Sequence, residues 1–310
     1  MRLTRMTEDD VALAVSAWNE TLVHNRITEQ KFRRILLQDS NYEPEAVRLA
    51  RSDDDSIVGL AACVVRRKVE GKDGGGREEE FGRGYLKAFY VAEHADRLLA
   101  ARALLEAAES YCVAAGKREL YVTQYTGPFF FPGIDVRYQR LLEILVAHGY
   151  RDTRTIEDVA VDLRGASINT RLEQARERAG AGVELLTWRP DLLPEMRRFV
   201  EEGNERQWFP VGWESRWTRE RERSFVLRKS REIIGWADYH AGRPRAGFGP
   251  TLVLPRERGR GYGALLLLEC MRRARDEGSQ TMSAGWANTG FYVACGWHVS
   301  RRFAVLVKEL

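Results

Sequence analysis

The chain repeats itself, and this repeat limits its fold more than any other feature. A shift of 162 positions places YVAEHADRLLAARALLEAAESYCVAAGKREL, residues 90–120, over LVLPRERGRGYGALLLLECMRRARDEGSQTM, residues 252–282, without a gap. Val91 then falls on Val253, and Gly116 falls on Gly278. Self-similarity at a fixed spacing indicates a duplicated structural unit. We therefore expect two domains of similar design, which agrees with a length of 310 residues.

Each copy predicts a strand, a short loop, a helix ended by glycine and a second strand. In the second copy, Leu267, Cys270 and Met271 follow helical spacing and form one apolar face. Gly116 and Gly278 suit the left-handed residue that often ends a helix. Both copies close on a short helix, a glycine and an aromatic residue, in LLEILVAHGY and NTGFYVACGW. The first copy alone carries an extra loop, YTGPFFFPGID.

The repeat also predicts the domain boundaries. The segment RGASINTRLEQARERAGAG is polar and flanked by glycines, and we expect it to form a linker helix. After it the chain restarts with VELLTWRPDLLPEMRRFVEEG, as MRLTRMTEDDVALAVSAWNE starts the first half. We therefore expect an N-terminal domain at 1–164, a helical linker at 165–182 and a C-terminal domain at 183–310. Mixed strands and helices in this order favour the α/β class.

Composition limits the kinds of partner. The apolar run Ala264–Leu268 is far shorter than the roughly 20 residues of a membrane-spanning helix. The charged start, MRLTRMTEDD, does not have the pattern of a signal peptide. A net charge of +4 is mild and does not favour nucleic acid. The four cysteines and five histidines are scattered, so we expect no metal site or disulfide framework. We expect a soluble cytoplasmic protein that binds neither membrane nor nucleic acid.

The second copy has a glycine loop, residues 258–263, before its helix. Gly259, Gly261 and Gly263 alternate with other residues, and Arg258 and Arg260 add positive charge. The first amides of a helix have no partner within the helix, and the helix dipole is positive there. Glycines let these amides approach an anion without steric clash. The loop therefore predicts a binding site for phosphate or pyrophosphate.

Other interpretations of the loop fit less well. A P-loop needs GxxxxGK followed by Ser or Thr, and a dinucleotide fingerprint needs GxGxxG. The sequence GRGYG matches neither pattern. A purely structural turn remains an alternative, although one or two glycines would suffice for it.

The stretch VLPRERGRGYGALLL resembles the acyl-CoA-binding motif of the GNAT acetyltransferases. That motif is Arg or Gln, two residues, Gly, one residue, then Gly or Ala, and Arg258, Gly261 and Gly263 occupy those positions. The closing element of the family is also matched, although Asn288 stands closer to Tyr292 than is common in it. The matching residues are Asn288, Phe291, Tyr292, Gly296 and Trp297.

The resemblance implies two tandem GNAT-like domains, each a mixed, mostly antiparallel sheet flanked by helices. It implies acetyl-CoA as the acyl donor, with no metal. The strand end would bind the pantetheine arm and the loop amides the pyrophosphate, and Pro255 would end the strand after Leu254. The implied cofactor-binding residues are Thr251, Leu252, Val253, Arg258, Gly259, Arg260, Gly261, Tyr262, Gly263, Ala264 and Asn288.

The resemblance also implies an N-acetyltransferase in which a primary amine attacks directly in a ternary complex. An amide near Val253 or Leu254 would stabilise the oxyanion, and Tyr292 would protonate the departing thiolate. Tyr292 could instead only pack. The cofactor strand AGFGPTLVL offers no Glu that could act as the base. Asp238 or His240, acting through a water molecule, is a weak candidate for this role. The alternative is that both are ordinary polar residues at the edge of a strand.

The stretch NERQWFPVGWESRW allows two interpretations. Its aromatic residues could line an acceptor pocket or form the core face of two short helices. These residues are Trp208, Phe209, Trp213 and Trp217. The acceptor itself, a small molecule or a peptide, is not defined by the sequence, and neither is the oligomeric state.

The first copy lacks the glycine loop. Under the shift, Gly259, Gly261 and Gly263 become Arg97, Leu99 and Ala101, and Arg258 becomes Asp96. Leu145 stands in place of Tyr292. We therefore expect a degenerate, non-catalytic N-terminal domain. Its extra loop could plug the groove or face the other half of the chain, and ordinary hydrophobic packing is the favoured role. Two rivals to an enzyme remain: a non-catalytic acyl-CoA sensor or scaffold, and a nucleotide-binding module.

Overall fold

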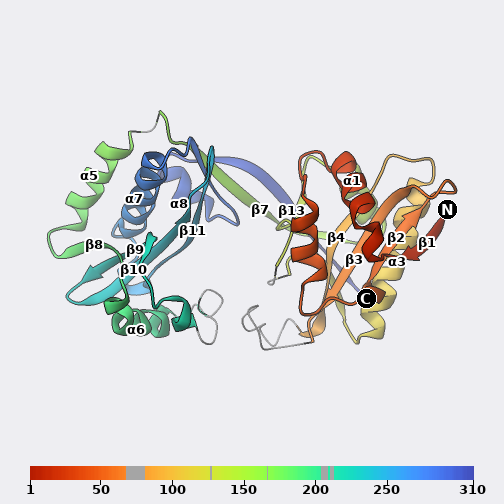
Figure 1. The fold of residues 1–310 in the computed structure, drawn as a ribbon, viewed down its shortest axis with the longest axis horizontal. Helices are drawn as coiled ribbons and strands as arrows, with labels where there is room; N and C mark the ends of the chain where they lie inside the picture. Colours follow the sequence, from red (N-terminus) through yellow and green to blue (C-terminus); the bar gives the residue numbers. More distant parts are fainter. Residues whose placement is uncertain (68–80, 126–127, 166, 204–208, 210–212) are drawn as a thin grey trace. The chain divides into compact units, whose positions relative to one another are not determined.

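The computed structural model describes residues 1–67, 81–125, 128–165, 167–203, 209 and 213–310 (Figure 1). The chain divides into two units, each with its own portion of the sheet and its own hydrophobic core. Unit 1 comprises Met1–Ile156 and Arg302–Leu310, and unit 2 comprises Glu157–Arg301.

The sheet of unit 1 follows the order β1, β2, β3, β4, β5, β13, with β6 beside β13. Neighbouring strands are antiparallel except β4 and β5, which are parallel. The strands are β1 (Arg2–Arg5), β2 (Val47–Arg51), β3 (Ile57–Val65), β4 (Arg83–Val91), β5 (Glu119–Val122) and β6 (Ile134–Asp135), with part of β7 (Arg151–Asp162) and the end of β13 (His298–Glu309). The helices are α1 (Val11–Thr21), α2 (Glu29–Phe32), α3 (Arg97–Ala114) and α4 (Gln139–Ala147).

The sheet of unit 2 repeats this plan in the order β8, β9, β10, β11, β12, β7. Again one pair, β11 and β12, is parallel, and the others are antiparallel. The strands are β8 (Val183–Trp188), β9 (Arg221–Lys229), β10 (Glu232–His240), β11 (Arg245–Val253) and β12 (Thr281–Ala284), with the end of β7. The helices are α5 (Ile168–Ala179), α6 (Leu193–Gly203), α7 (Tyr262–Asp276) and α8 (Thr289–Ala294).

The repeat seen in the sequence is a repeat of structure. Arg83 pairs with Glu119 in unit 1, and Arg245 pairs with Thr281 in unit 2. The residue numbers of both partners therefore differ between the units by 162, the spacing of the sequence repeat. Gly116 and Gly278 follow the two long helices with φ of 72° and 92°, the left-handed conformation expected from their positions. The fold class is therefore as predicted: in each unit, mixed and mostly antiparallel strands are flanked by helices.

Equivalent glycines bring the long helix close to the sheet in both units. A Cβ added to Gly59 of β3 would lie 2.8 Å from Leu104 of α3, and one added to Gly235 of β10 would lie 3.2 Å from Leu266 of α7. Leu104 and Leu266 are related by the repeat. Because side chains alternate across a strand, the residue that follows each glycine points to the opposite face of the sheet, away from the long helix.

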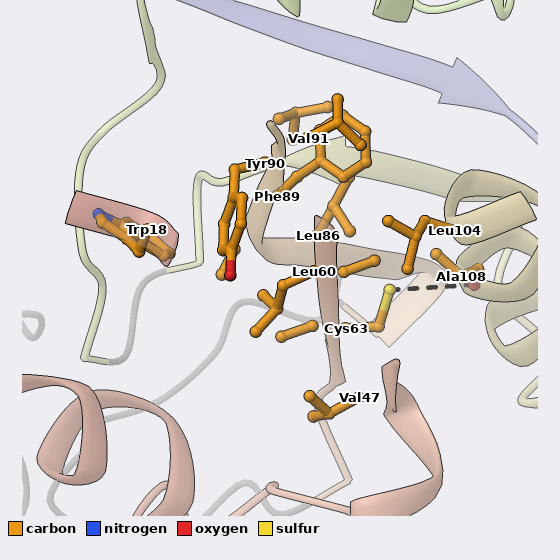
Figure 2. Close-up of a cluster of buried hydrophobic side chains, with 14 of the residues drawn as sticks. Trp18, Val47, Leu60, Cys63, Leu86, Phe89, Tyr90, Val91, Leu104 and Ala108 are labelled. Atoms are coloured by element: carbon orange, nitrogen blue, oxygen red, sulfur yellow. Dashed lines mark hydrogen bonds between the residues drawn. The ribbon is translucent and has the colours of Figure 1, made fainter. Parts of the chain in front are cut away.

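The core of unit 1 fills both faces of its sheet. On one face the Tyr90 hydroxyl donates to the carbonyl of Ala14 in α1, at 3.0 Å. Figure 2 shows Trp18 beside Tyr90 and, on the other side of the strands, Leu104 and Ala108 of α3. The Cys63 thiol lies 3.9 Å from the Ala108 carbonyl. All four cysteines are free and buried, so they pack as small apolar residues.

The limits of the two units differ from the boundaries expected at 164 and 183. Strand β7 enters unit 2 at Glu157 and pairs with β12, whereas β13 returns to unit 1 at Arg302 and pairs with β5. The expected linker does form a helix, α5, but Ile168 and Leu172 place it in the core of unit 2. The repeat does not reveal this exchange, because an alternating strand pattern does not specify its partner strand.

Candidate active site

The two parallel strands of unit 2 separate halfway along β11. Pairing with β12 covers only Arg245–Gly247, opposite Thr281–Ser283, whereas β11 pairs with β10 as far as Val253. The second half of β11 therefore has an edge without a strand partner in the described part of the chain. Such an edge offers main-chain donors and acceptors to a ligand.

The direction of the β11 amides decides which of them a ligand meets. The amide of Leu254 donates to the carbonyl of Ile234 in β10, at 3.0 Å. In an antiparallel pair, alternate residues point toward the same partner strand, so the amides of Thr251 and Val253 point to the open edge. The sequence offered two amides as oxyanion donors. The prediction of Leu254 is wrong, because its amide already donates to Ile234, whereas the amide of Val253 points to the open edge.

The glycine loop meets the requirements of an anion site. Pro255–Glu257 form a short 3-10 turn after β11, and α7 begins at Tyr262. Gly259 and Gly261 have φ of 79° and 83°, a left-handed conformation that favours glycine. A Cβ added to either residue would have no atom within 4 Å, so the space above both is open. The first amides of α7 follow this loop directly and have no partners within the helix.

Gly263 has a different role from the other two glycines. An added Cβ would lie 3.1 Å from Cε2 of Phe291 in α8, closer than a normal contact. Phe291 in turn contacts the Tyr292 ring, with centroids 5.0 Å apart. Gly263 therefore lets α8 approach the first turn of α7. The spacing of the two residues in the sequence gave no sign of this contact.

Three arginines surround the loop, and their partners differ. Arg256 pairs with Glu202 and Glu232 at 2.5 and 3.1 Å, and Arg260 lies 3.5 Å from the buried Glu257. Arg258 donates to the carbonyl of Val253, at 3.1 Å, and has no carboxylate partner among the described residues. Arg258 is therefore the cation most available to a phosphate at this loop. Glu257, which also contacts Lys229, was not identified from the sequence.

Tyr292 lies at the point where β11 leaves β12. Its ring is 6.0 Å from that of Phe248 in β11 and 5.2 Å from that of Trp297. The residue is 7% exposed, and burial raises the pKa of its phenol to about 12. Its hydroxyl has no hydrogen-bond partner in the described part of the chain, so it remains free to donate to a ligand.

The structure brings most of the predicted cofactor residues together. Thr251, Leu252 and Val253 lie on β11, and the loop and Ala264 follow directly. The Tyr262 side chain is buried in the core, so only its backbone faces the loop. Asn288 precedes α8, and its carbonyl accepts from the Phe291 amide at 3.1 Å.

The residues proposed around the acceptor are mostly buried. Phe209, Trp213 and Trp217 pack in the core of unit 2, with Phe209 4.8 Å from the Trp236 ring, so the core alternative is correct for them. Trp208 lies outside the described residues. Burial raises the pKa of the Asp238 carboxyl, and nearby Arg221 opposes this. His240 is exposed at the end of β10.

Among the described residues of unit 1, the equivalent region is filled by side chains. Phe130 from the extra loop is 5% exposed and packs 5.0 Å from Trp18 and 5.8 Å from Phe32. The space beyond the β4–β5 pairing, between Leu86 and Val122, retains a cavity of only about 20 Å³, which fits about one water molecule. Phe130 of the extra loop therefore packs in the core and fills this space.

Comparison with known proteins identifies the family. The model of the acetyltransferase (GNAT) family matches residues 12–128 and 166–297. The chain belongs to this family, with one match in each half. A search of curated proteins finds none that matches this sequence.

Solved structures show the same fold at low sequence identity. A GCN5-related N-acetyltransferase from Sphaerobacter thermophilus has 15% identity and a TM-score of 0.65, over 99% of this chain and 95% of that one. A tandem GNAT protein from the clavulanic acid biosynthesis pathway has 14% identity and a TM-score of 0.66, over 99% and 98%. A glucosamine N-acetyltransferase region of a fungal multi-domain protein has 15% identity and a TM-score of 0.73, but this chain spans only 38% of that protein. Within the described residues, no helix is long and apolar enough to cross a membrane.

Proposed function

We propose that this chain is an acetyl-CoA-dependent N-acetyltransferase with its active site in unit 2. The observation that carries the proposal is the combination of an open glycine loop with the free edge of β11 and Tyr292. Family membership supports acetyl transfer in general. Unit 1 is proposed to keep the fold without catalysing, and the protein is proposed to act in the cytoplasm on a primary amine of a small molecule or a peptide.

The arrangement fits the shape of acetyl-CoA. The amides from Gly259 to Ala264 and the guanidinium of Arg258 bind the diphosphate. The pantetheine arm then runs along the open edge of β11, where Val253 to Phe248 span roughly 16 Å at about 3.3 Å per residue. The thioester comes to lie near the Phe248–Tyr292 contact. No metal is needed for this binding.

The chemistry is direct attack by the neutral amine on the thioester carbonyl. An amide on the open edge of β11, that of Thr251 or Val253, donates to the oxyanion as it forms. Tyr292 donates its proton to the thiolate that leaves. The phenol is protonated at neutral pH even at its ordinary pKa of 10, which is the form this step requires, and burial raises the pKa further, to about 12. The acceptor ammonium loses one proton to solvent before attack. As the C–S bond breaks, the nitrogen loses a second proton to become the amide, and this proton restores the Tyr292 phenolate to the phenol.

Thiol release from acetyl-CoA tests the proposal with a panel of primary amines. We expect turnover with at least one amine, and a fall in kcat of roughly 100-fold in Tyr292→Phe, the lower end of the effect of a general acid. The affinity for acetyl-CoA should change little. Binding of acetyl-CoA without turnover of any amine would instead support a non-catalytic sensor, and binding of ATP or NAD in competition with CoA would support a nucleotide-binding module.

A further inference from the structure

One arginine on the α6 side of unit 2 is held rigidly but keeps free donors. Arg221, at the start of β9, donates through Nη2 to Oδ2 of Asp238 at 2.8 Å. The guanidinium also lies over the Trp217 ring, 4.3 Å from its centroid. Its side chain is 34% exposed, and Nε and Nη1 donate to no group among the described residues. Two contacts therefore fix the plane of the guanidinium while one edge of it remains available.

Asp238 lies behind Arg221 and is not itself available to a ligand. The residue is 6% exposed. One carboxylate oxygen accepts from Arg221, and the other accepts from Nε1 of Trp236 at 2.7 Å. A molecule that approaches this pair therefore meets the guanidinium first. This geometry does not favour Asp238 as the base that receives a proton from the acceptor.

The pair lies next to the proposed reaction centre. Ala237 of β10 pairs with Thr251, but Tyr239 pairs with Phe248, so Asp238 lies opposite an interruption in β11. Neighbouring strands are about 4.8 Å apart. Asp238 is therefore one strand away from Phe248, but the two side chains point to opposite faces of the sheet. Tyr239, which pairs with Phe248, points to the α7 face, where its hydroxyl donates to Glu277, whereas Trp236 and Asp238 point to the α6 face. An acceptor held by Arg221 therefore approaches the open edge of β11 from the α6 face.

We infer that Arg221 binds an oxyanion of the acceptor, so the acceptor is an amine that also carries a carboxylate or a phosphate. The inference rests on the proposed function and specifies its substrate class. Arginine presents a planar fork of N–H donors that matches the oxygens of these groups. Because Asp238 and Trp217 hold this fork in place, little side-chain freedom is lost on binding. An acceptor with only ammonium groups finds no partner at this position.

Matched pairs of acceptors test the substrate class. Amino acids are compared with their carboxamides, and glucosamine 6-phosphate with glucosamine, by kcat/KM at saturating acetyl-CoA. We expect the anionic member of at least one series to react about 10- to 100-fold better, the range for a charge-assisted hydrogen bond. The series that shows this preference distinguishes carboxylate from phosphate. Turnover without preference for the anionic member in either series would overturn the inference and leave the proposed function standing.

Variants of Arg221 link the preference to this side chain. Arg221→Gln should remove the preference, Arg221→Lys should keep part of it, and the KM for acetyl-CoA should stay unchanged. Arg221→Gln with Asp238→Asn avoids a buried unpaired carboxylate if the single variant folds poorly. Arg223→Gln is the matched control, because Arg223 lies on the same strand but pairs with Glu277, at the end of α7. Equal losses for charged and neutral acceptors in Arg221→Gln would contradict the inference, and absence of turnover in the wild-type protein would contradict the proposed function itself.

Discussion

The helices α3 and α7 occupy equivalent positions after a parallel strand pair, but their first turns differ. The start of α7 has left-handed glycines at 259 and 261 with open space above them. The start of α3 has Asp96 and Leu99 at the positions of Arg258 and Gly261, and Leu99 is 55% exposed. Duplication preserved the scaffold, which depends on apolar spacing. The proposed anion site depends on a few residues without side chains, and these are absent from the equivalent positions of unit 1.

A second difference lies behind the helices. In unit 1, Phe130 fills the space beyond the parallel strand pair, whereas in unit 2 the end of β11 has no strand partner on that side in the described residues. The missing glycine loop and the filled groove are two separate differences between the units, and each would prevent binding. Restoring one of them alone should therefore not restore binding.

The largest expected effect is on the number of acetyl-CoA sites. Calorimetry should show one site per chain, and Gly261→Leu should weaken it by at least about 100-fold. The substitution forces a left-handed leucine, which costs about 1–2 kcal/mol, and it removes charge-assisted contacts worth about 1.5–3 kcal/mol each. Leu99→Gly is the matched control in unit 1 and should not create a second site. Two equivalent sites in the wild-type protein would contradict the difference between the units.

The filled groove of unit 1 should appear in its stability. Phe130→Ala should lower the free energy of unfolding of unit 1 by about 3–5 kcal/mol, because a buried aromatic side chain is removed. Urea denaturation followed unit by unit measures this change. Phe129→Ala is the control, since Phe129 is 37% exposed and should contribute less. If Phe130→Ala left the stability unchanged, the packing role of the loop would be wrong.

A smaller effect is expected where α7 and α8 meet. Gly263→Ala places a Cβ 3.1 Å from Phe291 and should displace α8, and with it Tyr292, by a few tenths of an ångström. We expect kcat to fall by roughly tenfold, because catalysis is sensitive to position. The helix propensity of alanine, better than glycine by about 1 kcal/mol, offsets part of the packing strain, so stability should change less than kcat.

Phe291→Leu in the Gly263→Ala background tests this coupling. The smaller side chain should restore most of kcat. A kcat that stays low in the double variant would show that the contact between the two residues is not the cause.

The smallest expected effect is on pH dependence. Burial raises the pKa of Tyr292 from its ordinary value of 10 to about 12, so the phenol remains a proton donor through pH 10. At every pH below about 11, ionisation of this residue should therefore leave the kcat of the wild-type protein unchanged. An alkaline fall near pH 10 that disappears in Tyr292→Phe would contradict this.

The sequence by itself determined the duplication, the fold class, the family and the position of the glycine loop. These features are local or periodic, so residue identities and spacing are sufficient to find them. The left-handed residues at 259 and 261 are an example, because glycine is the residue that tolerates this conformation. The loss of these residues in the first half was visible in the same way.

Only the tertiary structure decided which groups meet. The Leu254 amide is used by Ile234, Phe291 requires a glycine at 263, and Asp238 is covered by Arg221. The exchange of β7 and β13 between the units also required the structure. The physical reason is common to all four: strand register and helix packing join residues far apart in the chain, and neither leaves a periodic pattern in the sequence.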